Sequence, residues 1–105
     1  MPKFLYVYHG GKPPSTPEEG AKAMAAWGKW MSDHDQAITD PGNPVGMSKT
    51  VSSSGVADNG GANPTSGYTI VEAPDIATAC RIAAENPMLT DGGSVEVAEI
   101  MPIEM

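Results

Sequence analysis

The chain has 105 residues, which is enough for one domain spanning residues 1–105. Thirteen acidic side chains against six basic ones give a net charge of −7, which disfavours binding to nucleic acid or to an anionic membrane surface. The single cysteine, Cys80, excludes an internal disulfide and a cysteine-based zinc site. We predict no metal site and no cofactor. No secretory leader or membrane-spanning run is recognisable, and we expect a cytoplasmic protein.

The first predicted strand covers residues 3–9, KFLYVYH, and ends at two glycines. Successive side chains of a strand point to opposite faces of the sheet. Leu5 and Val7 are aliphatic, whereas Tyr6 and Tyr8 between and after them are aromatic. We therefore predict that the two faces of this strand meet different surroundings.

A first helix is predicted to begin at Thr16. This side chain can cap free backbone N–H groups, Pro17 suits the first helical position, and Glu19 completes a capping box. Apolar residues then recur every three or four positions, which predicts one buried face. Trp27 and Trp30 follow this spacing, so we interpret them as core residues rather than as a stacking site for a ligand.

The middle of the chain is predicted to hold a short strand, a longer strand and two loops. Residues 35–46 are typical of a loop with a strand stub at 37–39, and residues 47–53 are predicted to form the second strand of the sheet. Residues 54–66 contain the sequence Asp-Asn-Gly-Gly, which favours a long mobile loop.

The last third of the chain predicts a strand, a helix and a strand. Residues 68–73, YTIVEA, form the best-patterned strand. A second helix follows Pro74 and ends near Pro87, and its buried stripe consists mostly of small side chains, among them an inert Cys80. Residues 94–100, SVEVAEI, alternate as the fourth strand.

This order predicts an α+β ferredoxin-like βαββαβ fold with both helices on one face of a four-stranded antiparallel sheet. Aliphatic residues of the first and last strands are assigned to the helix-covered face: Leu5, Val7, Val95 and Val97. Tyr6, Tyr8 and Glu96 then fall on the uncovered face. Exposed aromatic residues on a sheet face indicate a partner. We therefore hypothesise that two copies pack sheet to sheet as a dimeric α/β barrel, with these residues lining its lumen.

Four segments of the chain carry a pattern found together in one protein family. They are FLYVYHGG in the first strand, TPEEGAKAMAAWGKW at the start of the first helix, SGYTIVEA in the third strand, and the ending NPMLTDGGSVEVAEI. With these segments the sequence resembles the YCII-related family, and within it the branch named for a DGPF motif. The resemblance implies the dimeric ferredoxin-like barrel.

The chain departs from that family at the residues linked to its chemistry. The resemblance implies a His early in the first helix, paired with an Asp before the Pro that follows the second helix. This sequence has Gly20 and Ala21 in the first region, Asn86 in the second, and DNGG at 58–61 in the approximate place of the DGPF motif. The chemistry of that pair is therefore not carried over to this chain.

Two residues are candidates for acid–base catalysis. His9 precedes two glycines through which a ligand can approach the backbone, although a solvated turn residue explains it as well. Glu96 is predicted to lie mid-strand beside Tyr6 and Tyr8, where partial burial would raise its pKa; a structural carboxylate at the dimer interface is the alternative. His34, at the end of the first helix, is interpreted as structural.

A further set of residues is predicted to bind a ligand: Tyr6, Tyr8, Asn43, Ser48, Tyr68 and Asn86. The amide of Asn43 can reach into a barrel mouth, and turn formation explains it equally well. Lys49, next to Ser48, is either an anion anchor or a charge that protects a strand edge from aggregation.

Three functions stay open on these residues. The first is a small cytoplasmic homodimer that binds a small organic molecule in its lumen. The second is a cofactor-independent enzyme for proton transfer or elimination, with Glu96 or His9 as the base and Tyr6 or Tyr8 as the donor. The third is an accessory module without a ligand.

Overall fold

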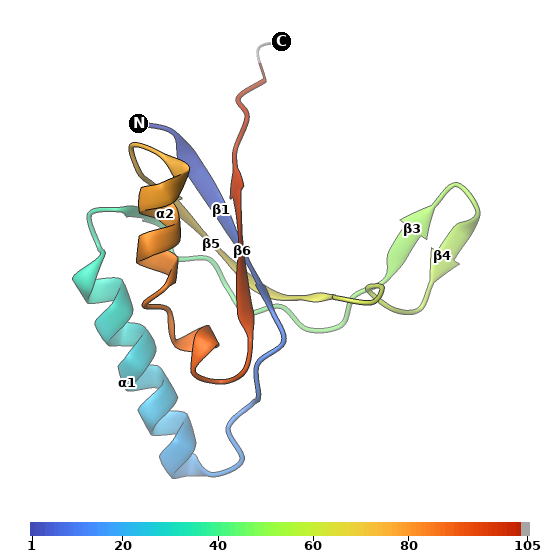
Figure 1. The fold of residues 1–105 in the computed structure, drawn as a ribbon. Helices are drawn as coiled ribbons and strands as arrows, with labels where there is room; N and C mark the ends of the chain where they lie inside the picture. The colour runs from blue at the N-terminus through green and yellow to red at the C-terminus, as the bar shows by residue number, and fades with distance from the viewer. Residues whose placement is uncertain (104–105) are drawn as a thin grey trace.

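The computed structural model of the protein describes residues 1–103. Its main sheet has four antiparallel strands in the order β2 (Ile38–Asp40), β5 (Thr65–Glu72), β1 (Lys3–His9) and β6 (Ser94–Glu99). Two helices, α1 (Pro17–Asp33) and α2 (Ile76–Ala83), cover one face together with the short 3-10 helix η1 (Pro87–Leu89) (Figure 1). No helix of the described residues covers the other face (Figure 1). This arrangement fits the α+β ferredoxin-like class predicted from the sequence.

The aromatic side of β1 packs beneath the helices. Phe4, Tyr6 and Tyr8 are at most 5% exposed. The ring centroids of Tyr8 and Trp27 lie 5.3 Å apart, and those of Tyr6 and Trp30 lie 6.2 Å apart. Tilted and edge-on aromatic pairs contribute about 0.5–1.5 kcal/mol each beyond the area that they bury. These contacts hold α1 against the centre of the sheet.

The two tyrosine hydroxyls find hydrogen-bond partners inside this core. Tyr6 donates to the carbonyl oxygen of Ala79 in α2. Tyr8 donates to Thr69 Oγ1 at 2.7 Å and accepts from Asn86 Nδ2 at 3.2 Å. Burial raises the pKa of both phenols, so both stay protonated at neutral pH.

The predicted face assignment of β1 is therefore wrong. We expected Leu5 and Val7 beneath the helices and Tyr6 and Tyr8 on the uncovered face, and the structure has the reverse. Aromatic rings bury much more area than aliphatic side chains, and they can do so here because each hydroxyl has a partner in the core. The small side chains of α2 leave room for this larger layer.

The predicted face assignment of β6 is correct. Val95 and Val97 pack against the core. Glu96 lies directly opposite Val7 of β1, and opposite residues of an antiparallel pair point to the same face of the sheet. Glu96 therefore lies on the uncovered face, as predicted.

Both predicted helix starts are confirmed. Thr16 Oγ1 accepts from the backbone N–H of Glu19 at 3.1 Å, and the Glu19 carboxylate accepts from the backbone N–H of Ser15 at 2.8 Å. The Asp75 carboxylate accepts from the backbone N–H of Thr78 at 2.8 Å, which lowers the pKa of Asp75. These caps satisfy N–H groups that have no partner within their helices.

Residues 47–53, predicted as the second strand of the sheet, lie outside the main sheet. Their strand β3 (Thr50–Ser52) pairs with β4 (Gly55–Ala57), which falls inside the predicted loop 54–66. The strand of the main sheet that follows α1 is instead β2, which lies at the sheet edge beside β5. It corresponds to the strand stub expected at 37–39. The observed element order therefore differs from a plain βαββαβ order by an inserted hairpin, which projects on the side away from the helices (Figure 1).

The whole molecule measures 43 × 41 × 19 Å along its principal axes. No helix within residues 1–103 is long and apolar enough to cross a membrane.

Replacing Tyr8 with Phe tests the buried hydrogen bonds of the core. The substitution removes the acceptor of the Asn86 amide and the donor to Thr69, so we expect a loss of about 1–3 kcal/mol in the free energy of unfolding, measured by urea denaturation. Tyr68→Phe on the uncovered face is the matched control, expected to change this free energy by less than about 0.5 kcal/mol. Equal losses in the two variants would contradict the role of the core hydrogen bonds.

Candidate functional site

The uncovered face of the sheet is apolar in its middle and charged at its rim. From the strand register, its side chains are Lys3, Leu5, Val7, Tyr68, Ile70, Glu72, Glu96 and Ala98. The apolar members of this set are half-buried. One row across three strands runs from Tyr68 through Val7 to Glu96 and spans about 10 Å, since neighbouring strands lie about 4.8 Å apart.

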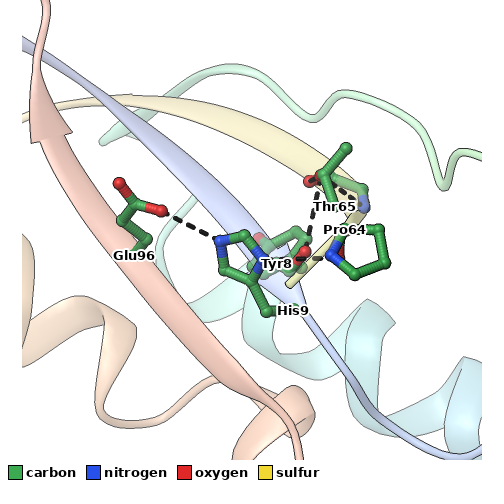
Figure 2. A network of polar contacts seen from close by, with 6 residues as sticks. Tyr8, His9, Pro64, Thr65 and Glu96 are labelled. Atoms are coloured by element: carbon green, nitrogen blue, oxygen red, sulfur yellow. Dashed lines mark hydrogen bonds and ion pairs between the residues drawn. The ribbon is translucent and has the colours of Figure 1, made fainter. Parts of the chain in front are cut away.

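His9 and Glu96 meet at one end of this face. His9 Nε2 lies 2.9 Å from Glu96 Oε1, and His9 Nδ1 lies 3.3 Å from the carbonyl oxygen of Pro64 (Figure 2). The imidazole is mostly covered, with 11% of the side chain exposed. The Glu96 side chain is 62% exposed, so the predicted partial burial of this carboxylate is wrong. The two residues that the sequence analysis singled out separately for acid–base chemistry thus form one hydrogen-bonded pair.

A β-bulge directs His9 toward this pair. The register between β1 and β5 shifts after Tyr8, so His9 lies opposite Thr65 rather than Ser66. Such an irregularity changes the direction of a side chain at the end of a strand. On the other side of β1 the chain approaches so closely that a Cβ on Gly93 would come within 2.8 Å of the His9 carbonyl oxygen. Only glycine allows β6 to begin this close to the histidine.

Both ring nitrogens of His9 face hydrogen-bond acceptors. A neutral imidazole has a single N–H, so one nitrogen would turn a lone pair toward an oxygen; the imidazolium donates to both. The hydrogen bond with Glu96 raises the pKa of His9 by more than burial lowers it, and the Pro64 carbonyl adds to the rise. This site therefore favours the charged form of the histidine.

The pair leaves one carboxylate oxygen available for chemistry. Glu96 Oε1 accepts from His9, while the rest of the exposed carboxylate points to solvent over the uncovered face. A carboxylate in this position can accept a proton from a bound molecule, and an adjacent imidazolium can stabilise an anionic oxygen.

Among the predicted ligand-binding residues, Tyr68 lies on the uncovered face in the same row as Glu96. Asn43 is exposed in the loop after β2, and its carbonyl oxygen accepts from the backbone N–H of Tyr68 at 3.2 Å. Ser48 packs at the base of the hairpin, where a Cβ on Gly60 would come within 2.3 Å of its Oγ. These two residues therefore flank the face rather than lie in its row.

Tyr6 and Tyr8 do not lie on the uncovered face as predicted, and Asn86, another predicted ligand-binding residue, is buried with them. All three are at most 5% exposed and lie on the helix side of the sheet. Asn86 Oδ1 accepts from the backbone N–H of Met88 at 2.8 Å and so caps η1, while its Nδ2 donates to Tyr8. Their polar atoms are used by the core.

The apolar residues of the uncovered face and the Pro64 carbonyl were not predicted from the sequence. One signal was present: His9 and Val7 are two residues apart, so both belong to one face of the strand. Placing Val7 on the uncovered face would have placed His9 there with Glu96. The Pro64 contact depends on how the hairpin returns to the sheet, for which the local sequence has no pattern.

Two hollows of a single copy lie on the helix side. One, of about 170 Å³, lies between α2 and β6 beside Cys80 and Val97, and another, of about 220 Å³, lies between α1 and η1 beside Trp30. The prediction that Cys80 belongs to the buried stripe of α2 is wrong, because this residue is exposed. Neither contains the His9–Glu96 pair. Within residues 1–103, no group of three or more His, Cys, Asp or Glu side chains stands close enough to hold a metal ion.

No protein-family model matches the chain, and no curated protein matches its sequence. Its fold is similar to that of the 5-chloro-2-hydroxyhydroquinone dehydrochlorinase TftG from Burkholderia phenoliruptrix AC1100, whose structure was determined in complex with 2,5-dihydroxybenzoquinone. The TM-score is 0.53 at 15% sequence identity, with 92% of this chain and 93% of that chain covered. The likeness supports the α+β ferredoxin-like architecture over almost the whole chain, and at this identity it concerns the fold alone. The YCII-related assignment stays a prediction.

The His9–Glu96 contact can be tested by titrating the histidine ring with NMR. We expect His9 to titrate above its ordinary pKa of 6.5 in the wild type and lower in Glu96→Gln, because an amide carries no charge. His34 at the end of α1 provides the second ring signal for assignment. The same His9 pKa in both proteins would contradict the contact.

The raised pKa also predicts a pH dependence of stability. A group whose pKa is higher in the folded state stabilises that state fully below its unfolded pKa and loses this effect as pH rises through the folded pKa. The difference in free energy of unfolding between wild type and Glu96→Gln should therefore be largest below pH 6.5 and shrink above it.

Proposed function

We propose that two copies of the chain pack through their uncovered sheet faces and enclose a site that binds a small organic molecule. Treating the β3–β4 hairpin as an insertion, the order of the remaining strands and helices supports a ferredoxin-like unit. Its uncovered face presents half-buried apolar side chains, and such a sheet face is stabilised by a second layer. A dimeric α/β barrel supplies that layer from an identical chain.

The apolar part of this face supports such a pairing. Full burial of one aliphatic side chain stabilises a protein by about 1.5–3 kcal/mol relative to full exposure. Leu5, Val7 and Ile70 are each half-buried, so a partner completes their burial in both copies at once. The gain amounts to several kcal/mol, which is comparable with the lower estimates of the cost of association.

Within this site we propose that the His9–Glu96 pair carries out proton transfer without a cofactor. The observation that carries this proposal is the 2.9 Å contact between His9 Nε2 and Glu96 Oε1 on the uncovered face. The free oxygen of Glu96 takes a proton from an O–H or C–H bond of the ligand. The electron pair stays on the ligand as an anion or expels a leaving group from the adjacent atom. The proton then passes from Glu96 to water or product.

Small hydroxylated ring compounds are the ligand class that we propose. The row from Tyr68 to Glu96 spans about 10 Å, which suits a single six-membered ring with its substituents. The His9 imidazolium attracts an anionic ring oxygen, and Tyr68 takes the part of hydroxyl donor that the sequence analysis gave to Tyr6 or Tyr8. The dehydrochlorinase of similar fold, solved with 2,5-dihydroxybenzoquinone, suggests this compound as a first probe.

Light scattering after size exclusion tests the pairing of two copies. At about 50 μM, a concentration at which a micromolar dimer is mostly associated, we expect twice the chain mass of 10.9 kDa for the wild type and 10.9 kDa for Val7→Lys. The second result follows from placing a charge in the middle of the apolar face. Ile76→Lys, at an exposed position of α2 on the other side, should remain dimeric. A monomeric wild type would refute the pairing.

Proton transfer can be measured without the natural substrate. The probe 2,5-dihydroxybenzoquinone carries ring C–H bonds whose exchange with deuterium is followed by NMR. We expect the protein to accelerate this exchange and Glu96→Gln to reduce the acceleration by about 10²–10⁴-fold. Glu99→Gln is the matched control, because Glu99 lies opposite Phe4 and not on the uncovered face.

Calorimetric titration with the same probe separates binding from catalysis. Binding with no acceleration of exchange would retain the ligand-binding function and reject the role of the pair as a base. A Glu96→Gln variant that accelerates exchange as well as the wild type would reject it too. No binding of the probe would reject the proposed ligand class.

A further inference from the structure

The β3–β4 hairpin is the part of the fold that the proposed site leaves unexplained. We call residues 45–64 the arm. The arm projects from the sheet on its uncovered side, away from both helices (Figure 1). Its two strands have three residues each and pair with one another outside the main sheet. A ribbon of two strands is at best marginally stable in water, so the arm is expected to pack against another surface.

The arm is held together by its own polar contacts. Lys49 Nζ lies 3.0 Å from Asp58 Oδ1, and Thr50 Oγ1 donates to the carbonyl oxygen of Asn59 at 2.7 Å. At its root, the backbone N–H of Val45 donates to the Ser66 carbonyl oxygen at 3.0 Å. These contacts give the ribbon a defined shape before it meets a partner, which lowers the entropy cost of docking.

One side of the ribbon is apolar and exposed. Val51 and Val56 lie directly opposite each other, so their side chains share one side of the ribbon. They are 76% and 63% exposed, and Met47 in the approach to β3 is 92% exposed. Exposed apolar side chains gathered on one projecting element mark a contact surface.

The charges of the arm and the uncovered face point to a second copy as the occupant. Three basic side chains and four acidic ones belong to these surfaces: Lys3, His9 and Lys49, and Asp40, Asp58, Glu72 and Glu96. With His9 protonated, this surface is close to neutral, although the chain as a whole carries −7. The acidic excess therefore lies elsewhere, and two copies can approach through these surfaces without strong repulsion. These surfaces carry no large net charge that would attract a strongly basic or acidic partner.

We propose that the arm of each copy lies along the second copy and packs Val51 and Val56 against the apolar residues of that copy's uncovered face. This inference rests on the proposed pairing of two copies. The arm and the uncovered face lie on the same side of the sheet, so a copy stacked on the face is within reach of the arm (Figure 1). A twofold pair is isologous, and each arm then meets the same surface.

The arm also connects the pairing to the candidate site. Pro64, the last residue of the arm, places its carbonyl oxygen 3.3 Å from His9 Nδ1 (Figure 2). A partner that fixes the arm therefore also fixes one of the two acceptors of the imidazole. Association and the proton state of His9 are coupled through this contact.

The double variant Val51→Glu with Val56→Glu tests the arm. We expect its dimer dissociation constant, measured by sedimentation over a dilution series, to rise at least tenfold over the wild type. Both side chains are largely exposed in the single copy, so circular dichroism should report an unchanged fold. The matched control is Met24→Glu with Ile76→Glu, two exposed apolar residues of the helices whose replacement should leave the constant unchanged.

Disulfide trapping provides a second measurement that does not depend on weakening the dimer. In a Cys80→Ser background, one protein carries Val56→Cys and is mixed with proteins that carry a single cysteine at Leu5, Ile70 or Ala98. We expect a covalent heterodimer on oxidation with at least one of the three, because a disulfide requires Cα atoms within about 7 Å.

The outcomes separate this inference from the proposed function. A dimer that Val7→Lys dissociates, and that the arm variant and the trapping leave unaffected, overturns the arm inference and retains the pairing. A wild type that is monomeric throughout the dilution series overturns both the pairing of two copies and the arm contact. The arm would then have to bind a different protein. A tenfold weakening together with trapping supports the arm contact.

Discussion

The fold depends on burying the aromatic side of β1 while both tyrosine hydroxyls keep hydrogen-bond partners. Tyr6 reaches the Ala79 carbonyl of α2, and Tyr8 joins Thr69 of β5 to Asn86 before η1. A phenol buried without a partner would cost about as much as the ring burial gains, so these contacts decide which face of β1 the helices cover. Everything on the uncovered face follows from that choice, because the strand alternates.

The sequence predicted correctly those features of the fold that depend on residues close together along the chain. The caps at Thr16 and Asp75 are set by a side chain and an N–H three residues away, so the start of each helix was predictable from the sequence. The end of α2 was not, because this helix stops at Ala83, before the predicted end near Pro87. The facing of β1 was not predictable in this way, because the partners of Tyr6 and Tyr8 lie 61 or more residues away along the chain. The tyrosine hydroxyls of an aromatic strand need hydrogen-bond partners. The strand sequence does not show whether water or the protein core supplies these partners.

Local sequence also failed to predict which strands join the main sheet. Residues 47–53 have the better strand composition, yet β2 at Ile38–Asp40 occupies the sheet and β3 does not. Strand propensity describes a residue's fit to a pleated surface, and that surface is provided here by β5. The bulge after Tyr8 and the return of the arm at Pro64 are likewise products of pairing between distant segments.

The candidate site is assembled by the same long-range pairing. His9 and Glu96 were each predicted from local features, and only the β1–β6 register places them within hydrogen-bond distance. A fold shared at 15% identity does not extend to function, so the proposed proton transfer depends on this chain's own residues. His9 contacts the carboxylate through one nitrogen and the root of the arm through the other. If the arm packs on a second copy, the acid–base chemistry of Glu96 is therefore tuned by association, and the single copy is not the complete site.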